Sequence, residues 1–242
     1  MAERDRIELV KFTEGPPTLG NWFVLEKDPL VDTLMAAAAP QSYFFDVWYE
    51  HAQVVEELID KGIIKNHRIA VDVGCHYGEA AYYLARLFKS VACFELDGAV
   101  ATMAKFNMDK FYLNNIRIFP YGLGEEERNV SVWRDYMGTQ KGRVHVEGGT
   151  RFSSKIKRMD FMNPIKIDFL KISTNGYESN VIKGAKKSIK KYKPVISVTT
   201  PNDYDFRYGS ETPDDQLIEM GYIKYEKEVE RKADLTSFYY CE

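Results

Sequence analysis

The sequence predicts an α/β fold in which a mostly parallel sheet of seven strands carries helices on both faces. Short apolar runs alternate with helical segments of about ten to fifteen residues, which is typical of strands joined by right-handed crossover helices. The last two runs lie close together and indicate a β-hairpin at the end of the sheet. The predicted strands are 69–74, 91–95, 116–119, 167–172, 194–198, 222–225 and 237–241.

Four segments between these strands have the apolar spacing of helices that pack on a sheet. The first covers residues 79–88, where Ala81, Leu84, Ala85 and Phe88 share one side. The others are 99–111, 177–192 and a helix that Pro213 opens and Gly221 ends.

Residues 1–66 are predicted to form an N-terminal extension, and residues 67–242 the domain that holds the sheet. The main element of the extension is an amphipathic helix over about 43–61, ended by Gly62. Within the domain, the polar-rich alternation of about 130–159 predicts an inserted β-segment or lid. A dense aromatic group on the N-terminal helix either packs it against the sheet or another subunit, or lines a substrate pocket: Tyr43, Phe44, Phe45, Trp48 and Tyr49.

The composition predicts a globular protein with a large core, because 45% of the 242 residues are hydrophobic and 29% are charged. The net charge of −3 gives no ground for expecting a nucleic acid or a membrane as a partner. Cys75, Cys93 and Cys241 are widely spaced, which speaks against a disulfide framework or a zinc cluster. The N-terminus lacks the apolar core of a signal peptide, so we expect a soluble, cytoplasmic protein. No metal site is expected, because no Cys/His cluster has the spacing of a zinc site.

A glycine-containing turn gives the clearest signal for a binding site. Asp72 to Gly78 leaves a buried strand and enters a helix, and glycines at 74 and 78 allow a tight turn whose free amides hold a polar or anionic group. Glu95 ends the next strand at about the distance where dinucleotide-binding folds place their ribose-binding acid.

The acidic Asp72 beside this turn disfavours a pyrophosphate and favours S-adenosylmethionine, which carries positive charge and no phosphate. A plain strand-to-helix turn with a solvated Glu95 is the structural alternative, and a nicotinamide-dependent oxidoreductase is the weakest hypothesis.

Several motifs together resemble the FkbM-type methyltransferases, in the order of that family and over about residues 67–225. They are Asp72-Val73-Gly74 through Glu79, Phe94-Glu95, Tyr121 through Gly124, Arg158-Met159-Asp160, Phe169 through Glu178, Lys183-Gly184-Ala185 and Lys193-Pro194. The resemblance implies a Rossmann-like class I methyltransferase sheet, S-adenosyl-L-methionine as cofactor, and O-methylation of a small-molecule or saccharide acceptor. It also implies that eleven residues bind the cofactor: Asp72, Gly74, Cys75, His76, Tyr77, Gly78, Glu95, Leu96, Tyr121, Gly122 and Leu123.

The sequence departs from the family pattern at three acidic positions, where Ser173, Asn175 and Thr199 stand. A carboxylate base and strong Mg²⁺ binding are therefore excluded at that cluster. Either the acceptor differs from the family norm and carries phosphate or carboxylate, or catalysis has been lost and a binding or structural module remains.

The candidate catalytic residues are Lys171, Ser173, Asn175 and Glu178. Lys171 is expected either to orient the acceptor or, as the favoured interpretation, to form an ion pair with Glu178. Glu178 is also expected to stabilise the start of its helix. His76 is a further candidate base within the glycine turn.

Five lysines fall on one face of the helix over 177–192, at Lys183, Lys186, Lys187, Lys190 and Lys191. This face is either a solvated outer surface or a docking surface for an acidic partner such as a nucleic acid. A homo-oligomer is also compatible with the sequence.

Overall fold

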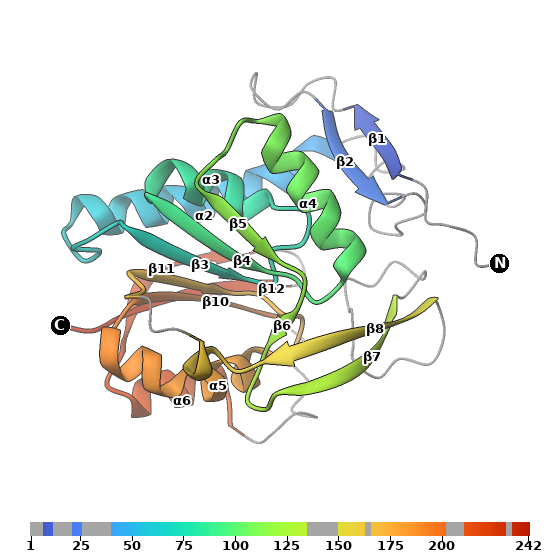
Figure 1. The fold of residues 1–242 in the computed structure, drawn as a ribbon. Coiled ribbons are helices and arrows are strands. Elements are labelled where there is room, and N and C mark those ends of the chain that lie inside the picture. The colour runs from blue at the N-terminus through green and yellow to red at the C-terminus, as the bar shows by residue number, and fades with distance from the viewer. Residues whose placement is uncertain are drawn as a thin grey trace.

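A seven-stranded sheet forms the centre of the computed structural model, which describes residues 7–11, 21–25, 40–134, 150–162, 166–201, 211–230 and 234–242. The strand order is β11-β12-β10-β9-β3-β4-β5 (Figure 1). The strands are β3 (Ile69–Val73), β4 (Ser90–Phe94), β5 (Ile116–Phe119), β9 (Phe169–Ile172), β10 (Val195–Pro201), β11 (Ile223–Glu230) and β12 (Asp234–Tyr240).

Five of these strands pair in parallel, and β12 runs antiparallel to both of its neighbours, β10 and β11. The predicted sheet with its C-terminal hairpin is therefore confirmed. Strand β11 extends five residues beyond the prediction for 222–225. The extension escaped prediction because its side chains are mostly charged and exposed, with Tyr225 and Val229 buried on the inner face.

Helices cover both faces of the sheet (Figure 1). On one side lie α2 (Pro40–Asp60), α3 (Glu79–Leu87) and α4 (Gly98–Lys110), and on the other lie α5 (Glu178–Tyr192) and α6 (Pro213–Glu219). Alternate strand residues supply two cores: Ala70 and Phe169 pack under α2 to α4, whereas Val71 and Leu170 pack under α5 and α6. Among the described residues, no helix is both long enough and apolar enough to cross a membrane.

Helix α2 belongs to the layer that covers the sheet. Its Val55 and Leu58 are fully buried in the same core as Ala70, and Glu57 accepts a hydrogen bond from the Tyr225 hydroxyl of β11 at 2.7 Å. The helix begins three residues before the predicted start at 43. Of its aromatic group, Trp48 is half-buried and Tyr49 is exposed, while the side chains of 43–45 lie outside the described part of the chain.

The inserted segment forms a small three-stranded sheet beside the large one (Figure 1). It consists of β6 (Gly122–Leu123), β8 (Thr150–Lys157) and β7 (Arg128–Arg134), followed by the short 3₁₀ helix η1 (Met159–Phe161). Residues 135–149 of the predicted lid lie outside the described residues. A separate pair, β1 (Ile7–Lys11) and β2 (Asn21–Leu25), is antiparallel.

The close contact between α5 and the β6–β7 turn gives a testable requirement for glycine. A Cβ atom at Gly184 would lie 1.9 Å from the carbonyl oxygen of Gly124, whereas a Cβ at Gly98 would meet nothing within 4 Å. We expect Gly184→Ala to lower the free energy of unfolding by about 1–3 kcal/mol despite the better helix propensity of alanine. Urea denaturation measures this, and Gly98→Ala is the control, with a change within about 0.5 kcal/mol. Equal stability of the two variants would contradict the contact.

Candidate functional site

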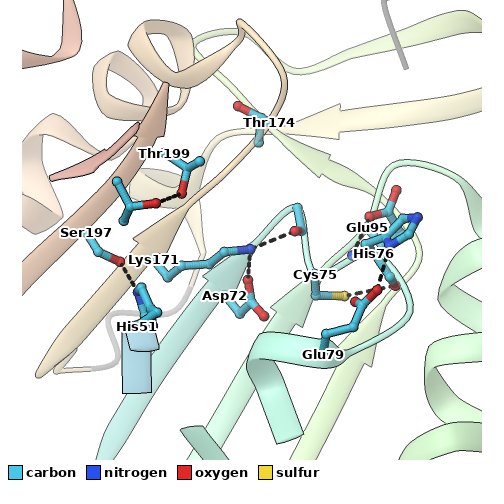
Figure 2. Close-up of polar contacts among 12 residues, drawn as sticks. His51, Asp72, Cys75, His76, Glu79, Glu95, Lys171, Thr174, Ser197 and Thr199 are labelled. Carbon is cyan, nitrogen blue, oxygen red and sulfur yellow. Dashed lines mark hydrogen bonds and ion pairs between the residues drawn. The ribbon is translucent and has the colours of Figure 1, made fainter. Parts of the chain in front are cut away.

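A row of polar residues crosses the sheet on the face covered by α2 (Figure 2). The strand register places Cys93, Asp72, Lys171 and Ser197 directly beside one another on β4, β3, β9 and β10. Ser197 is buried and its hydroxyl lies 2.9 Å from Nε2 of His51 on α2. His51 was not recognised from the sequence, because nothing near it in the chain marks its contact with a strand 146 residues later.

Asp72 and Lys171 form a buried ion pair at the centre of this row. The distance from Lys171 Nζ to Asp72 Oδ1 is 2.7 Å, and the two side chains are 1% and 0% exposed. Lys171 Nζ also donates a hydrogen bond to the carbonyl oxygen of Gly74 at 2.8 Å and lies 4.6 Å from the centre of the Trp48 ring. Burial raises the pKa of Asp72, and the neighbouring ammonium group opposes this. The second carboxylate oxygen, Oδ2, has no hydrogen-bond partner in the described part of the chain.

The glycine turn between β3 and α3 is shaped by contacts within the protein. Gly74 has φ +77°, and a Cβ atom there would lie 1.9 Å from the carbonyl oxygen of Ser173. The turn after β3 therefore touches the turn after β9. Gly78 has φ +96° and packs against the Met108 side chain of α4, where a Cβ would lie 2.7 Å from Cε. At Gly74 the backbone contact leaves no room for a side chain, and at both positions the positive φ favours glycine.

Glu95 lies at the carboxyl end of β4 and faces the glycine turn (Figure 2). Its Oε2 accepts a hydrogen bond from the backbone amide of His76 at 2.9 Å, and its Oε1 accepts one from Asp97 at 3.0 Å. Burial raises the pKa of this carboxyl, and these two hydrogen bonds oppose the rise. Glu95 thus joins the end of β4 to the glycine turn after β3, and its role in holding a ribose stays a prediction.

His76 and Glu79 form a second acid–base pair in the turn. The distance from His76 Nδ1 to Glu79 Oε1 is 2.8 Å, and the Glu79 side chain is only 3% exposed. His76 itself has φ +51°, a left-handed conformation, and its ring centre lies 4.1 Å from that of Tyr77. Glu79 was missed as a site residue, although its position three residues after His76 at the helix start was a usable signal.

The residues predicted to bind the cofactor divide into two groups. Glu95, Leu96 and the turn backbone lie near the opening, and Leu96 packs against Gly122, where a Cβ would lie 3.0 Å from Leu96 Cδ1. Tyr121 belongs to the same group, because the centre of its ring lies 5.6 Å from that of Phe94 at the end of β4. In contrast, the side chains of Cys75, Tyr77 and Leu123 are 2%, 0% and 3% exposed and belong to the two cores. These three can offer only their backbone to a ligand.

Cys75 is not an activated nucleophile. Its thiol is buried beside Cys93, and the contact with Cys93 together with burial raises its pKa well above the usual value.

The expected ion pair between Lys171 and Glu178 is wrong, because Lys171 pairs with Asp72 on the opposite face of β9. Glu178 is fully buried, and its carboxylate accepts hydrogen bonds from the amide of Thr174 at 2.6 Å and the amide of Gly176 at 3.0 Å. Burial raises the pKa of Glu178. This carboxylate holds the turn between β9 and α5 in shape and does not face the opening between β3 and β4.

The three positions that lack the family's acids lie in or near this turn. Ser173 is half-buried, and its amide donates to the Val73 carbonyl at 3.0 Å. Asn175 is exposed with φ +55°, a conformation that asparagine tolerates. Thr199 is buried, and its hydroxyl lies 2.8 Å from that of Thr236. Within the described ranges, no three His, Cys, Asp or Glu side chains are grouped to hold a metal ion.

The strand order, the reversed β12 between β10 and β11, and a glycine turn facing an acid on the next strand define a class I methyltransferase fold. The methyltransferase FkbM domain matches residues 72–235, and the chain belongs to this family.

Comparison with solved structures found several methyltransferases. An FkbM methyltransferase from Methylobacillus flagellatus KT is 17% identical, with a TM-score of 0.53 over 72% of this chain and 44% of that chain. This chain thus spans less than half of that relative. A precorrin-6y C5,15-methyltransferase from Geobacter metallireducens is 10% identical, with a TM-score of 0.46 over 73% of this chain and 81% of that one. An rRNA methylase from Streptococcus thermophilus is 11% identical, with a TM-score of 0.45 over 75% and 93%. No curated protein matches the sequence.

The Asp72–Lys171 pair predicts a pH-dependent loss of stability on mutation. Lys171→Met leaves a buried, unpaired carboxylate and should lower the free energy of unfolding by about 3–5 kcal/mol at pH 8. Without the ammonium group, the pKa of folded Asp72 rises further above its unfolded value. The folded variant then binds a proton more tightly than the unfolded chain, so its deficit shrinks as the pH falls from 8 to 5.

Urea denaturation at the two pH values tests this expectation. The double variant Asp72→Val/Lys171→Met contains no buried charge at this position and should be more stable than Lys171→Met alone. A deficit that is equal at both pH values would show that Asp72 is not the group responsible.

Proposed function

We propose that this protein is an S-adenosylmethionine-dependent methyltransferase that methylates a hydroxyl oxygen of a small-molecule or saccharide acceptor. The observation that carries the proposal is the position of Glu95, whose carboxylate lies across the opening from the glycine turn and 2.9 Å from the amide of His76. A carboxylate in this place can accept both hydroxyls of a ribose. Membership of the FkbM family supports methyl transfer as the chemistry.

The residues at this opening fit such a cofactor. Glu95 would hold the ribose, the segment Leu96 with Tyr121 and Gly122 would border the adenine, and the amides of the turn at 74–78 would meet the methionine end. When bound, the cofactor supplies a methyl group on a positively charged sulfur; an acceptor oxygen takes this group as the carbon–sulfur bond breaks and its own proton is lost to a base or to water.

Asp72 does not select the cofactor by its charge. A free carboxylate would repel a pyrophosphate, but Lys171 neutralises that of Asp72. The preference therefore rests on Glu95 and on the family. The charge-neutral Asp72–Lys171 pair instead fixes the turn, because the same ammonium group holds the Gly74 carbonyl.

Few side chains at this site can act as a base, so the main contribution of the protein to the reaction is to align the acceptor with the methyl group. Ser173, Asn175 and Thr199 supply no carboxylate base, and Glu178 is committed to backbone amides. His76, held by the buried Glu79 through Nδ1, is the group near the turn that can accept a proton from an acceptor. Much of the barrier to a displacement of this kind is lowered by alignment of the acceptor with the methyl group.

A catalytically degenerate binding module is the second candidate. It is favoured by the fact that three family acids are neutral here and that Glu95 is already hydrogen-bonded to His76 and Asp97. A degenerate module can still bind the cofactor, whereas only an enzyme transfers its methyl group. Both cofactor binding and methyl transfer therefore need to be measured.

Titration calorimetry with S-adenosylhomocysteine tests the proposed site. We expect the wild-type chain to bind, and Glu95→Ala to weaken binding by about 10- to 100-fold, since hydrogen bonds to a charged group contribute about 1.5–3 kcal/mol. Glu219→Gln, on the exposed end of α6, is the control and should leave the affinity unchanged. A wild-type chain that does not bind the ligand at millimolar concentration would refute the proposal, whereas binding without methyl transfer to any acceptor pool would favour the degenerate module.

A further inference from the structure

The small net charge of the chain hides a strong separation of charge along the sequence. Residues 150–193 contain 12 Lys and Arg but only three Asp and Glu. The whole chain has 33 basic and 36 acidic residues, so the remainder holds 21 basic and 33 acidic residues. The segment thus has a net charge of +9 and the rest −12, and the net charge of −3 is no argument against an anionic partner.

The three acids of this basic segment are all committed to backbone amides. Asp160 accepts hydrogen bonds from the amides of Lys187 and Ser188 at 3.0 and 2.8 Å. Asp168 accepts from Arg68 and Ile69, and Glu178 accepts from Thr174 and Gly176. Asp168 and Glu178 are buried, and the Asp160 side chain is 0% exposed. The exposed charge of the segment is therefore positive throughout.

Helix α5 presents most of this positive charge on one face. Lys186, Lys187, Lys190 and Lys191 are exposed and Lys183 is half-buried, while Val181, Ile182, Ala185 and Ile189 pack into the core beneath them. Because the helix is held by its apolar side, the lysines form a fixed row. Lys183 lies 3.8 Å from Glu211, and the exposed Glu125 lies near the same helix, since a Cβ atom at Gly184 would be 3.1 Å from its amide nitrogen.

Aromatic rings alternate with the cations beside this row. Lys157 Nζ lies 4.3 Å from the centre of the Tyr121 ring, and the guanidinium of Arg158 lies 5.1 Å from that of Phe161. The Phe161 side chain is 65% exposed, which is unusual for so large an apolar group.

Contacts place these elements next to one another. Lys157 pairs with Leu123 across β8 and β6, and its carbonyl accepts a hydrogen bond from the Gly124 amide. Gly124 touches Gly184 of α5, and Asp160 fixes η1 to the middle of α5. The surface runs from Tyr121, beside the candidate cofactor site, along η1 to the lysine row.

We propose that this surface, formed by α5, η1 and the end of β8, binds single-stranded nucleic acid. Phosphates would follow the lysine row, and exposed bases would stack on the ring of Phe161 and on the neighbouring guanidinium group. Single strands combine closely spaced negative charges with exposed flat bases, and this combination matches a surface of cations and rings better than an acidic protein or a membrane does.

Fluorescence anisotropy of the full chain with a labelled oligonucleotide of about 12 nucleotides tests the proposal. We expect binding that weakens with salt. The double variant Lys186→Gln/Lys190→Gln should lose roughly tenfold in affinity at 0.15 M salt and flatten the slope of log K against log [salt] by about 1.4, since each phosphate contact on a single strand contributes about 0.7. Lys65→Gln/Lys89→Gln, which neutralises two exposed lysines elsewhere, is the matched control and should change neither quantity.

Phe161→Ala separates stacking from charge. It should weaken binding by roughly tenfold and leave the salt slope unchanged, because stacking on an aromatic ring releases no counterions. RNA and DNA of the same sequence, run in parallel, identify which strand is preferred.

Two results would overturn the proposal. The first is that neither oligonucleotide binds at 50 mM salt. This result would overturn the proposal even if phosphatidylserine vesicles or heparin bound to the chain. The other is binding that both lysine pairs affect equally. Neither result concerns S-adenosylhomocysteine binding, so failure here leaves the proposed methyltransferase function standing, and the reverse also holds.

Discussion

The buried ion pair between Asp72 and Lys171 is the constraint on which the centre of this protein depends. Two charges in a dry interior are tolerated only when their geometry and hydrogen bonding are good, and here they occupy directly opposite positions on adjacent strands. The pair requires β9 to lie next to β3 in one register. A shift of one residue would turn Lys171 into the opposite core, among Val71 and Leu170. The pair therefore specifies the strand order as well as the site.

The same ammonium group links this register to the shape of the glycine turn. By holding the Gly74 carbonyl, Lys171 joins the end of β9 to the end of β3, where Gly74 and Ser173 are in backbone contact. Asp72 is neutralised by Lys171 and the three family acids are absent, so Glu95 is the carboxylate beside the glycine turn that we assign to a ligand. The proposed site then combines one acid with otherwise neutral groups, which suits the positively charged cofactor of our proposal.

Most of the fold, but only part of the site, could be predicted from the sequence. The strands and helices follow from local apolar patterns, and the facing of Glu95 and the glycine turn follows from their spacing on consecutive strands. The partner of Lys171 could not be predicted in this way, because Gly74 and Asp72 lie nearly a hundred residues before it and adjacency depends on strand order. Glu178 was favoured because it is near in sequence, but it lies on the other side of the strand. The side chains of Cys75, Tyr77 and Leu123 point into the cores for a similar reason: a motif fixes the path of the backbone more closely than the direction of each side chain.

The positive charge of the segment 150–193 arises because its few carboxylates serve as hydrogen-bond acceptors inside the fold. In the segment 150–193 each acid is buried or covered and accepts hydrogen bonds from backbone amides. Of the cations in the segment that are not fully buried, these acids pair only with Arg158 among the described residues, through Asp160 at 3.9 Å. Whole-chain charge cannot reveal this, because the compensating acids lie in other segments. A field of one sign over a fixed helix face attracts a polyanion at long range and loses that attraction as salt is added. At the end of β8, Lys157 lies 4.3 Å from the centre of the Tyr121 ring, so a strand held on the proposed surface would come close to the segment that we assign to the cofactor.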